Sequence, residues 1–167
     1  HALDATILDE AAAARARLTD YVDESFDISV NLTNASLQWD GLVEAVENSV
    51  KTHGIFCSQL CLEITEQDAI SSTEDVVHKI EELKAHGHRF LIDDFGMGHP
   101  SLLYLQTGFF AVVKLDGSLT RNVLENETNA EIIGSITKLG ESIHFTTIAE
   151  WVESKEQLEK LKALGCD

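Results

Sequence analysis

The chain has 167 residues, of which 44% are hydrophobic and 25% charged, and its formal net charge is −17. This balance predicts one soluble globular domain, and the negative charge argues against a nucleic-acid polymer or an anionic membrane as partner, because both require a basic surface. No apolar run approaches the roughly 20 residues of a membrane helix. We therefore expect a cytoplasmic domain, with membrane tethering of the parent protein left open.

Segments rich in β-formers alternate with helical patterns along the chain. The predicted strands are Phe26–Leu32, Leu60–Thr65, Phe90–Phe95, Phe110–Asp116 and Phe145–Val152. The predicted apolar helix faces consist of Leu3, Ile7, Ala11, Ala14 and Leu18; Leu42, Val46 and Val50; Val76, Ile80 and Leu83; Ile132, Ile136 and Leu139; and Leu158, Leu161 and Leu164. Ser72 or Thr73 would cap the third of these helices. The alternation predicts a parallel sheet covered by helices.

Both an open doubly wound sheet and a closed barrel fit this alternation. The open sheet usually has a glycine-rich phosphate loop after its first strand, whereas "SVNLTNAS" follows here without a glycine. The sequence therefore favours a TIM-barrel-like (β/α)8 architecture. Because a complete barrel takes about 250 residues, we expect this chain to form an incomplete barrel.

Cysteines and histidines do not predict a zinc site. Cys57, Cys61 and Cys166 are too few for a disulfide framework, and buried reduced thiols are the simpler interpretation. The histidines are scattered, and His86 and His88 fall on a helix-to-strand connection where solvated imidazoles are expected.

Polar residues occur near the C-terminal end of each predicted strand, within otherwise apolar runs. They are Asn31; Glu63 and Glu66; Asp93 and Asp94; Lys114 and Asp116; and Glu150 and Glu153. Any one of these acids alone is more simply a solvated loop residue or a helix cap. In a parallel barrel, however, these ends share one rim, and we expect Asn31, Glu63, Asp93 and Glu150 to converge there.

Convergence of carboxylates requires a counter-charge. Two carboxylates 4 Å apart repel by about 4 kcal/mol at an effective dielectric near 20. Oxygen-only donors suit hard cations such as Mg²⁺ or Mn²⁺. Because successive strand side chains point to opposite faces, Asp93 would enter the barrel mouth, and Asp94 would turn towards a second ion where the strand ends. Gly96 and Gly98 would let the following loop fold back over the rim.

Six motifs in order carry a resemblance to a known family. "SVNL", "LEITE", "DDFGMGHPSL", "VKLD", "AEWVE" and "GCD" resemble, in order and spacing, the EAL-domain phosphodiesterases of bacterial cyclic di-GMP signalling. The resemblance covers essentially the whole chain. It implies a TIM-barrel-like fold and hydrolysis of cyclic di-GMP to linear pGpG with two Mg²⁺ or Mn²⁺ ions. It also implies a homodimer formed through the region after the "DDFG" loop, and it allows a flanking GGDEF or sensor domain in the parent protein.

The same resemblance implies a role for each matching residue. Ligands of the first ion would be Asn31, Glu63 and Asp93, and ligands of the second would be Asp93, Asp94 and Glu150. Lys114 resembles the lysine that holds the attacking water, so Lys114, Glu150 and Asp94 form the predicted catalytic set. Glu66, with Gly96 and Gly98, would support the loop after the aspartate pair.

Departures from the family pattern keep other functions open. The sequence contains no "EAL" tripeptide, whose glutamate would ligate the first ion from an upstream strand. We therefore expect residues 1–167 to be the central part of an EAL domain that lacks its first and last strands and has little activity alone. Trp151 replaces the glycine of the family motif. The alternatives are a catalytically inactive relative that binds cyclic di-GMP or a protein partner, and a metal-dependent barrel hydrolase or lyase of another substrate.

Overall fold

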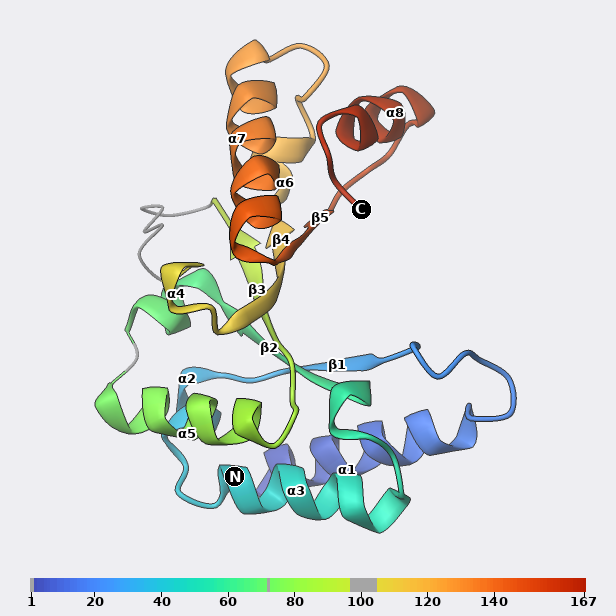
Figure 1. Ribbon diagram of the computed structural model, residues 1–167, viewed down its shortest axis with the longest axis vertical. Coiled ribbons are helices and arrows are strands. Elements are labelled where there is room, and N and C mark those ends of the chain that lie inside the picture. Colours follow the sequence, from blue (N-terminus) through green and yellow to red (C-terminus); the bar gives the residue numbers. More distant parts are fainter. Residues whose placement is uncertain (1, 72, 97–104) are drawn as a thin grey trace. The chain divides into compact units, whose positions relative to one another are not determined.

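The computed structural model of the chain (Figure 1) describes residues 2–71, 73–96 and 105–167. Its strands are β1 (Ile28–Asn31), β2 (Leu60–Thr65), β3 (Phe90–Phe95), β4 (Phe110–Leu115) and β5 (Thr146–Ala149). The α-helices are α1 (Ala2–Arg17), α2 (Asn34–Gln38), α3 (Leu42–His53), α4 (Glu66–Ile70), α5 (Glu74–Ala85), α6 (Gly117–Thr120), α7 (Glu127–Ile143) and α8 (Lys155–Ala163). Two 3₁₀ segments, η1 (Cys57–Gln59) and η2 (Leu105–Thr107), precede β2 and β4.

The strands form one sheet in the order β1-β2-β3-β4-β5, and β1 pairs parallel with β2, as β4 does with β5. An open doubly wound sheet reverses its strand order at a switch point. The sequential order found here is instead that of a TIM-barrel-like α/β fold, as predicted. The central strands match their predicted bounds closely, whereas β1 and β5 are shorter than predicted. Phe26 and Val152, at the outer limits of those two predictions, are exposed.

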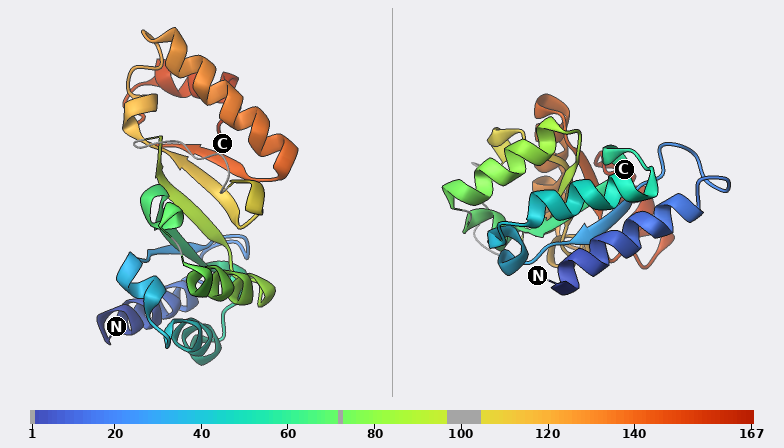
Figure 2. Two further views of the ribbon diagram at one scale, coloured as in Figure 1. Left: turned by 90° about the vertical axis from the view of Figure 1, so that its left-hand side faces the viewer. Right: turned by 90° about the horizontal axis from the view of Figure 1, so that it is seen from below.

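The chain divides into two compact units, which are described separately. Unit 1 comprises His1–Ile64 and Ser71–Phe90, and unit 2 comprises Thr65–Ile70 and Leu91–Asp167. In unit 1, helices α1, α3 and α5 lie on the same side of β1 and β2 (Figures 1 and 2). The predicted faces of α3 and α5 are confirmed by burial of Leu42, Val46 and Val50, and of Val76, Ile80 and Leu83.

The predicted apolar face of α1 is wrong. Leu3 is 71% exposed and Ile7 44% exposed, whereas Leu8, Ala12 and Arg15 are buried. Arg15 explains the shift, because its Nε donates to the carbonyl of Phe26 at 2.7 Å and its guanidinium lies over the Phe26 ring. Because arginine is charged, a buried arginine does not contribute to a hydrophobic periodicity. The pattern of apolar residues therefore predicted a helix face next to the one that is buried.

In unit 2, α7 packs on β5, and the chain returns after α8 so that the Asp167 amide donates to the Thr147 carbonyl at 2.9 Å. Two predicted face residues, Ile132 and Leu158, are exposed, which corrects part of the prediction for α7 and α8. Some buried positions of these helices are polar instead. One is Gln157 on α8, whose Nε2 donates to the Arg121 carbonyl at 2.8 Å.

One of the two residues predicted to cap α5 does so in the structure. The Thr73 hydroxyl accepts from the Val76 amide at the start of α5, as one of the two predicted caps. The other candidate, Ser72, lies outside the described residues. None of the helices in the described ranges is long and apolar enough to cross a membrane.

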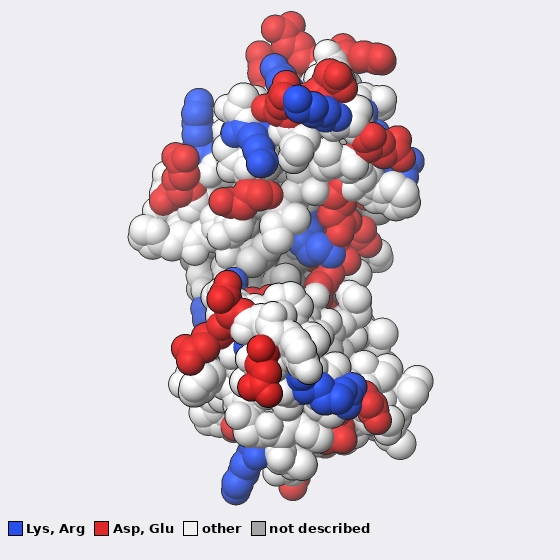
Figure 3. All heavy atoms as spheres, turned by 90° about the vertical axis from the view of Figure 1, so that its right-hand side faces the viewer, with Lys and Arg blue, Asp and Glu red and all other residues white. Residues whose placement is uncertain are grey.

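Charged side chains are spread over the face drawn in Figure 3, with basic groups set among more numerous acidic ones. A polyanion requires a continuous basic surface. Among the described residues of the face in Figure 3, basic side chains are separated by acidic ones.

We predict that Arg15→Ala lowers the free energy of unfolding by about 2–4 kcal/mol, because it removes the part-buried hydrogen bonds to the Phe26 and Asp23 carbonyls and the packed aliphatic atoms of a buried side chain. Urea denaturation measures the change. The matched control is Arg17→Ala on the same helix, whose exposed side chain should change stability by no more than about 0.5 kcal/mol. Equal losses in the two variants would contradict the structural role of Arg15.

Candidate functional site

The end of β3 places two adjacent carboxylates on one side of the chain. Asp94 has φ of 55°, in the left-handed region, so the strand alternation breaks at this residue. Oxygens of Asp93, Asp94 and Glu150 consequently lie within 4.8 Å of one another. Aspartate tolerates this backbone conformation better than most residues, although it costs of order 1 kcal/mol. Because the alternation breaks at Asp94, the adjacent side chains of Asp93 and Asp94 can take part in one site.

Lys114 supplies the positive charge of this group. Its Nζ lies 2.9 Å from Asp93 Oδ1 and 2.7 Å from Glu150 Oε1, and all three side chains are largely buried. The ion pairs join the ends of β3, β4 and β5 within unit 2. Lys114 therefore offsets part of the repulsion among these carboxylates without a metal ion.

Asp94 has electrostatic surroundings that disfavour its ionised form. Burial raises its pKa above the usual 3.8, and the neighbouring charges of Asp93, Asp116 and Glu150 raise it further, while Lys114 opposes them. A group whose ionised form is disfavoured in the metal-free protein would gain from a bound cation. Asp94 thus links the geometry of the group to cation binding.

Asp116 and Glu153, which the sequence also places at strand ends, make local structural contacts. Asp116 Oδ1 accepts from the Ser118 amide at 2.7 Å and caps α6. Burial acts to raise the pKa of Asp116, but hydrogen bonds from Ser118 and Gly117 and the charge of Arg121 outweigh it and hold the pKa below its usual value. Glu153 is exposed, and its amide donates to Gln157 at the start of α8.

Glu66 contacts the backbone that follows the aspartate pair. Its Oε2 accepts from the Gly96 amide at 3.1 Å, and its Oε1 is buried with no hydrogen-bond partner among the described residues. Gly96 has φ of 104°, a conformation that favours glycine, and a Cβ there would approach Leu119 Cδ1 to 2.6 Å, so that leucine would have to shift. The third predicted loop residue, Gly98, lies outside the described residues.

The backbone around Glu150 shows residues that sequence reasoning had not assigned to the site. Thr120 Oγ1 donates to the Glu150 carbonyl at 2.6 Å, and the Glu150 amide donates to Leu115 at the end of β4. Trp151 has φ of 55°, and the Arg121 guanidinium lies 4.0 Å from the centre of its ring. The substitution of a family glycine by Trp151 was a signal for this left-handed backbone, whereas nothing in the sequence distinguished Thr120.

Asn31 and Glu63 form a separate pair in unit 1. They are partners in the parallel register of β1 and β2, which places them at the same level near the C-terminal ends of both strands. Glu63 is 3% exposed, so its carboxyl is buried within an apolar strand. The structure thus brings together Asn31 with Glu63, and Asp93 with Asp94, Lys114 and Glu150. Convergence of these two sets stays a prediction.

Oxygen-only donors decide which ion the carboxylate group in unit 2 would accept. Three carboxylates with one lysine leave an excess of negative charge, and hard divalent cations prefer such ligands. The residues therefore fit a divalent metal ion. Together with the parallel strands in sequential order, they define the class of TIM-barrel-like α/β proteins with carboxylates at the C-terminal strand ends.

Comparison with known proteins makes this assignment specific. The profile of the EAL domain matches residues 1–167, and the chain belongs to the EAL domain family. The bifunctional diguanylate cyclase/cyclic di-GMP phosphodiesterase MucR of Pseudomonas aeruginosa is 34% identical over 161 residues, which are 96% of this chain and 24% of that protein. The chain thus spans about a quarter of the length of this curated relative.

Solved structures show the same fold. The PaMucR phosphodiesterase in complex with c-di-GMP has a TM-score of 0.89 and 32% identity, covering 99% of this chain and 67% of that one. BlrP1 of Klebsiella pneumoniae, in a manganese/cy-diGMP complex at pH 6, has a TM-score of 0.87 and 26% identity, covering 98% of this chain and 41% of that one. The incomplete TIM-barrel-like arrangement of the chain is therefore that of EAL domains.

We predict that Asp94→Asn holds or raises the melting temperature of the metal-free protein, whereas Asp93→Asn lowers it by removing an ion pair with Lys114. A raised pKa in the folded state means that ionisation of Asp94 weakens folding, and that this loss grows as pH rises above 3.8. The gain from Asp94→Asn should thus be largest near neutral pH and shrink on acidification.

Thermal unfolding in the presence of a chelator, at several pH values, checks both variants. Both substitutions remove one carboxylate charge from the same strand end, so each serves as the control for the other. A larger loss of stability in Asp94→Asn than in Asp93→Asn would contradict the electrostatic assignment.

Proposed function

We propose that this chain is the central part of a cyclic di-GMP phosphodiesterase that hydrolyses its substrate to linear pGpG. The single observation that carries the proposal is the placement of Lys114 between Asp93 and Glu150, with Asp94 in the same group. Support also comes from membership of the EAL domain family and from relatives named for this activity. Because the chain covers only a part of those relatives, the activity is proposed for the longer protein.

The carboxylates would hold two divalent ions, Mg²⁺ or Mn²⁺. We assign Asp93, Asp94 and Glu150 to the second ion, and Asn31, Glu63 and Asp93 to the first, as the family resemblance implies. Manganese in the BlrP1 complex supports a divalent ion, and Mg²⁺ is proposed on the hardness of the oxygen ligands. Such ions supply Lewis-acid activation of water and stabilisation of the leaving alkoxide.

Side chains of the site would position the reacting groups. Lys114 carries three N–H donors, so it can release a carboxylate and donate to the attacking water or to a phosphate oxygen. Glu66 would fix the loop after the aspartate pair through the Gly96 amide. Glu150 is held from its backbone by Thr120, which keeps its carboxylate directed to Lys114.

The parent protein would carry further partners. A flanking GGDEF or sensor domain is proposed from the bifunctional name of the MucR relative. A homodimer through the region after Gly96 is proposed from the family resemblance alone. A catalytically inactive cyclic di-GMP receptor remains the alternative function, because the glutamate of the "EAL" motif is not among these residues.

We predict that Lys114→Met in the longer protein lowers kcat for release of pGpG by at least about 100-fold, since it removes the positively charged donor of the site. The matched control is Lys138→Met on α7, where the side chain is exposed and turnover should match the wild type. The assay follows pGpG from cyclic di-GMP with Mg²⁺ and with Mn²⁺.

A comparison of chain lengths accompanies this assay. We expect residues 1–167 alone to turn over at most weakly, since a predicted ligand of the first ion is missing. Tight binding of cyclic di-GMP by the longer protein without turnover would favour the receptor, and neither binding nor turnover would overturn the proposed substrate. Equal rates for both lengths would overturn the requirement for an upstream ligand.

A further inference from the structure

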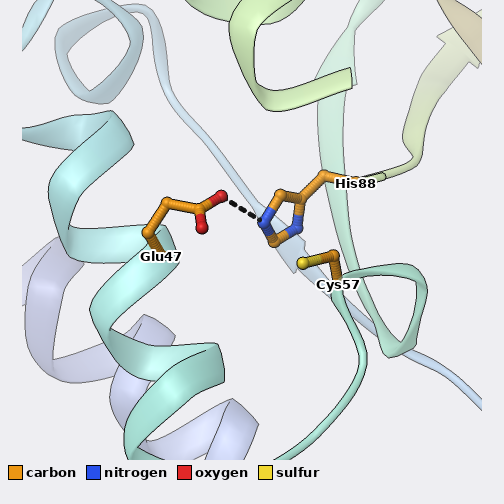
Figure 4. A group of neighbouring side chains, drawn as sticks. All are labelled: Glu47, Cys57 and His88. Carbon is orange, nitrogen blue, oxygen red and sulfur yellow. Dashed lines mark hydrogen bonds and ion pairs between the residues drawn. The ribbon is translucent and has the colours of Figure 1, made fainter. Parts of the chain in front are cut away.

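A second group of metal-ligand side chains lies in unit 1, apart from the carboxylates described above. Glu47 on α3, Cys57 at the start of η1 and His88 just before β3 each direct a donor atom towards the others (Figure 4). Their donor atoms all lie within 4.8 Å of one another. We propose that Glu47, Cys57 and His88 form a binding site for a zinc-like transition-metal ion. The proposal is independent of the proposed phosphodiesterase activity.

His88 is already oriented as a metal ligand. Its side chain is fully buried, which corrects the expectation of a solvated imidazole at this position. Nδ1 lies 3.4 Å from the carbonyl of Leu60, and Nε2 lies 3.1 Å from Glu47 Oε1. A metal-bound histidine commonly donates its other ring N–H to a backbone carbonyl, which fixes the tautomer. With Nδ1 donating to Leu60, Nε2 presents its lone pair to the Glu47 carboxylate, and a cation between them would replace the direct contact.

The backbone on both sides of the group is fixed by local hydrogen bonds. The His88 amide donates to the Leu83 carbonyl at 3.0 Å, and the Gln59 amide donates to Phe56 at 2.9 Å across η1. Gly87 has φ of 100°, and a Cβ there would lie 3.7 Å from Cys57 Cβ, so the two connections run close together. Such a site loses little freedom when an ion binds.

Ligand chemistry distinguishes this site from the carboxylate group of unit 2. A thiolate, an imidazole and a carboxylate match zinc, whereas Mg²⁺ and Ca²⁺ prefer oxygen donors. Donors of a tetrahedral zinc ion lie roughly 3.5 Å apart, given bonds of about 2.0–2.3 Å. The His88 and Glu47 donor atoms lie 3.1 Å apart and all three donor atoms lie within 4.8 Å of one another, so side-chain shifts would bring them to that spacing, and a water molecule would complete four-coordination.

His86 and the charge of Glu47 affect the orientation and the protonation of the three ligands. His86 Nδ1 lies 3.0 Å from the same Glu47 Oε1, so this half-exposed histidine would hold the carboxylate in place as a positioning residue. Burial raises the pKa of the Cys57 thiol, and the charge of Glu47 raises it further. A bound cation offsets both effects, because metal coordination stabilises the thiolate.

The position of the site indicates a structural role. Cys57 and His88 precede the N-terminal ends of β2 and β3, while Glu63 lies at the other end of β2. In TIM-barrel-like folds, residues at the N-terminal ends of the strands serve stability rather than catalysis. An ion held there would tie α3 to the connections that enter two neighbouring strands, and it would raise the stability of unit 1.

The test uses Co²⁺ as a spectroscopic probe and Zn²⁺ as the competing ion, with excess Mg²⁺ present to occupy the carboxylate group. We expect a thiolate-to-cobalt charge-transfer band that Zn²⁺ abolishes, and a higher melting temperature with Zn²⁺. Cys57→Ser should abolish the band and weaken zinc binding at least 10-fold, and Glu47→Gln should weaken it in the same direction. Cys61→Ala is the matched control, because Cys61 is buried outside the group, and it should retain the band.

A second readout separates ligation from folding. Zn²⁺ should slow alkylation of Cys57, the one partly exposed cysteine, while burial raises the pKa of Cys61 to about 12 and that of Cys166 to about 11, leaving both unreactive. His86→Ala should weaken zinc binding but keep the band, whereas the exposed control His78→Ala should change neither. Absence of the band in the wild type, or its persistence in folded Cys57→Ser, would overturn the site.

Discussion

The candidate site in unit 2 depends on the charge balance between three carboxylates and one ammonium group at the ends of β3, β4 and β5. Charges 4 Å apart interact by about 4 kcal/mol at an effective dielectric near 20, which is comparable to a large share of a domain's net stability. Lys114 pairs with both Asp93 and Glu150 but offsets only one negative charge, so the group keeps an excess of negative charge that includes Asp94. The ion pairs of Lys114 therefore make this group of carboxylates tolerable in the folded protein.

Two strained backbone positions serve this group. Asp94 and Trp151 both adopt left-handed φ values; Asp94 directly follows Asp93 in β3, and Trp151 directly follows Glu150 just after β5. Strain of this kind, of order 1–3 kcal/mol per residue, persists when surrounding contacts hold it. Lys114 and the Thr120 hydroxyl provide such contacts, and the stacking of Arg121 on Trp151 adds another.

Hard and soft donors occupy different parts of the chain. Carboxylates and an asparagine amide lie at C-terminal strand ends, while a thiol, an imidazole and one glutamate gather before the N-terminal ends of β2 and β3. Oxygen-only donors prefer hard cations, whereas a thiolate and an imidazole prefer softer ones, so the two groups differ in ligand chemistry. Within unit 1, Cys57 and His88 lie before the N-terminal ends of β2 and β3, whereas Glu63 lies near the C-terminal end of β2, so the soft donors and this hard donor are separated by the length of the strand.

The sequence by itself determined the strand–helix alternation, the middle strands, the helix faces of α3 and α5, and the residue types of the acidic site. Periodicity and motif spacing carry that information because they are local properties of the chain. Only tertiary structure decided the buried face of α1, the enclosure of His88 and its approach to Cys57 and Glu47, and the ion pairs of Lys114. Each depends on groups far apart in sequence, whose burial and charge balance no local pattern encodes.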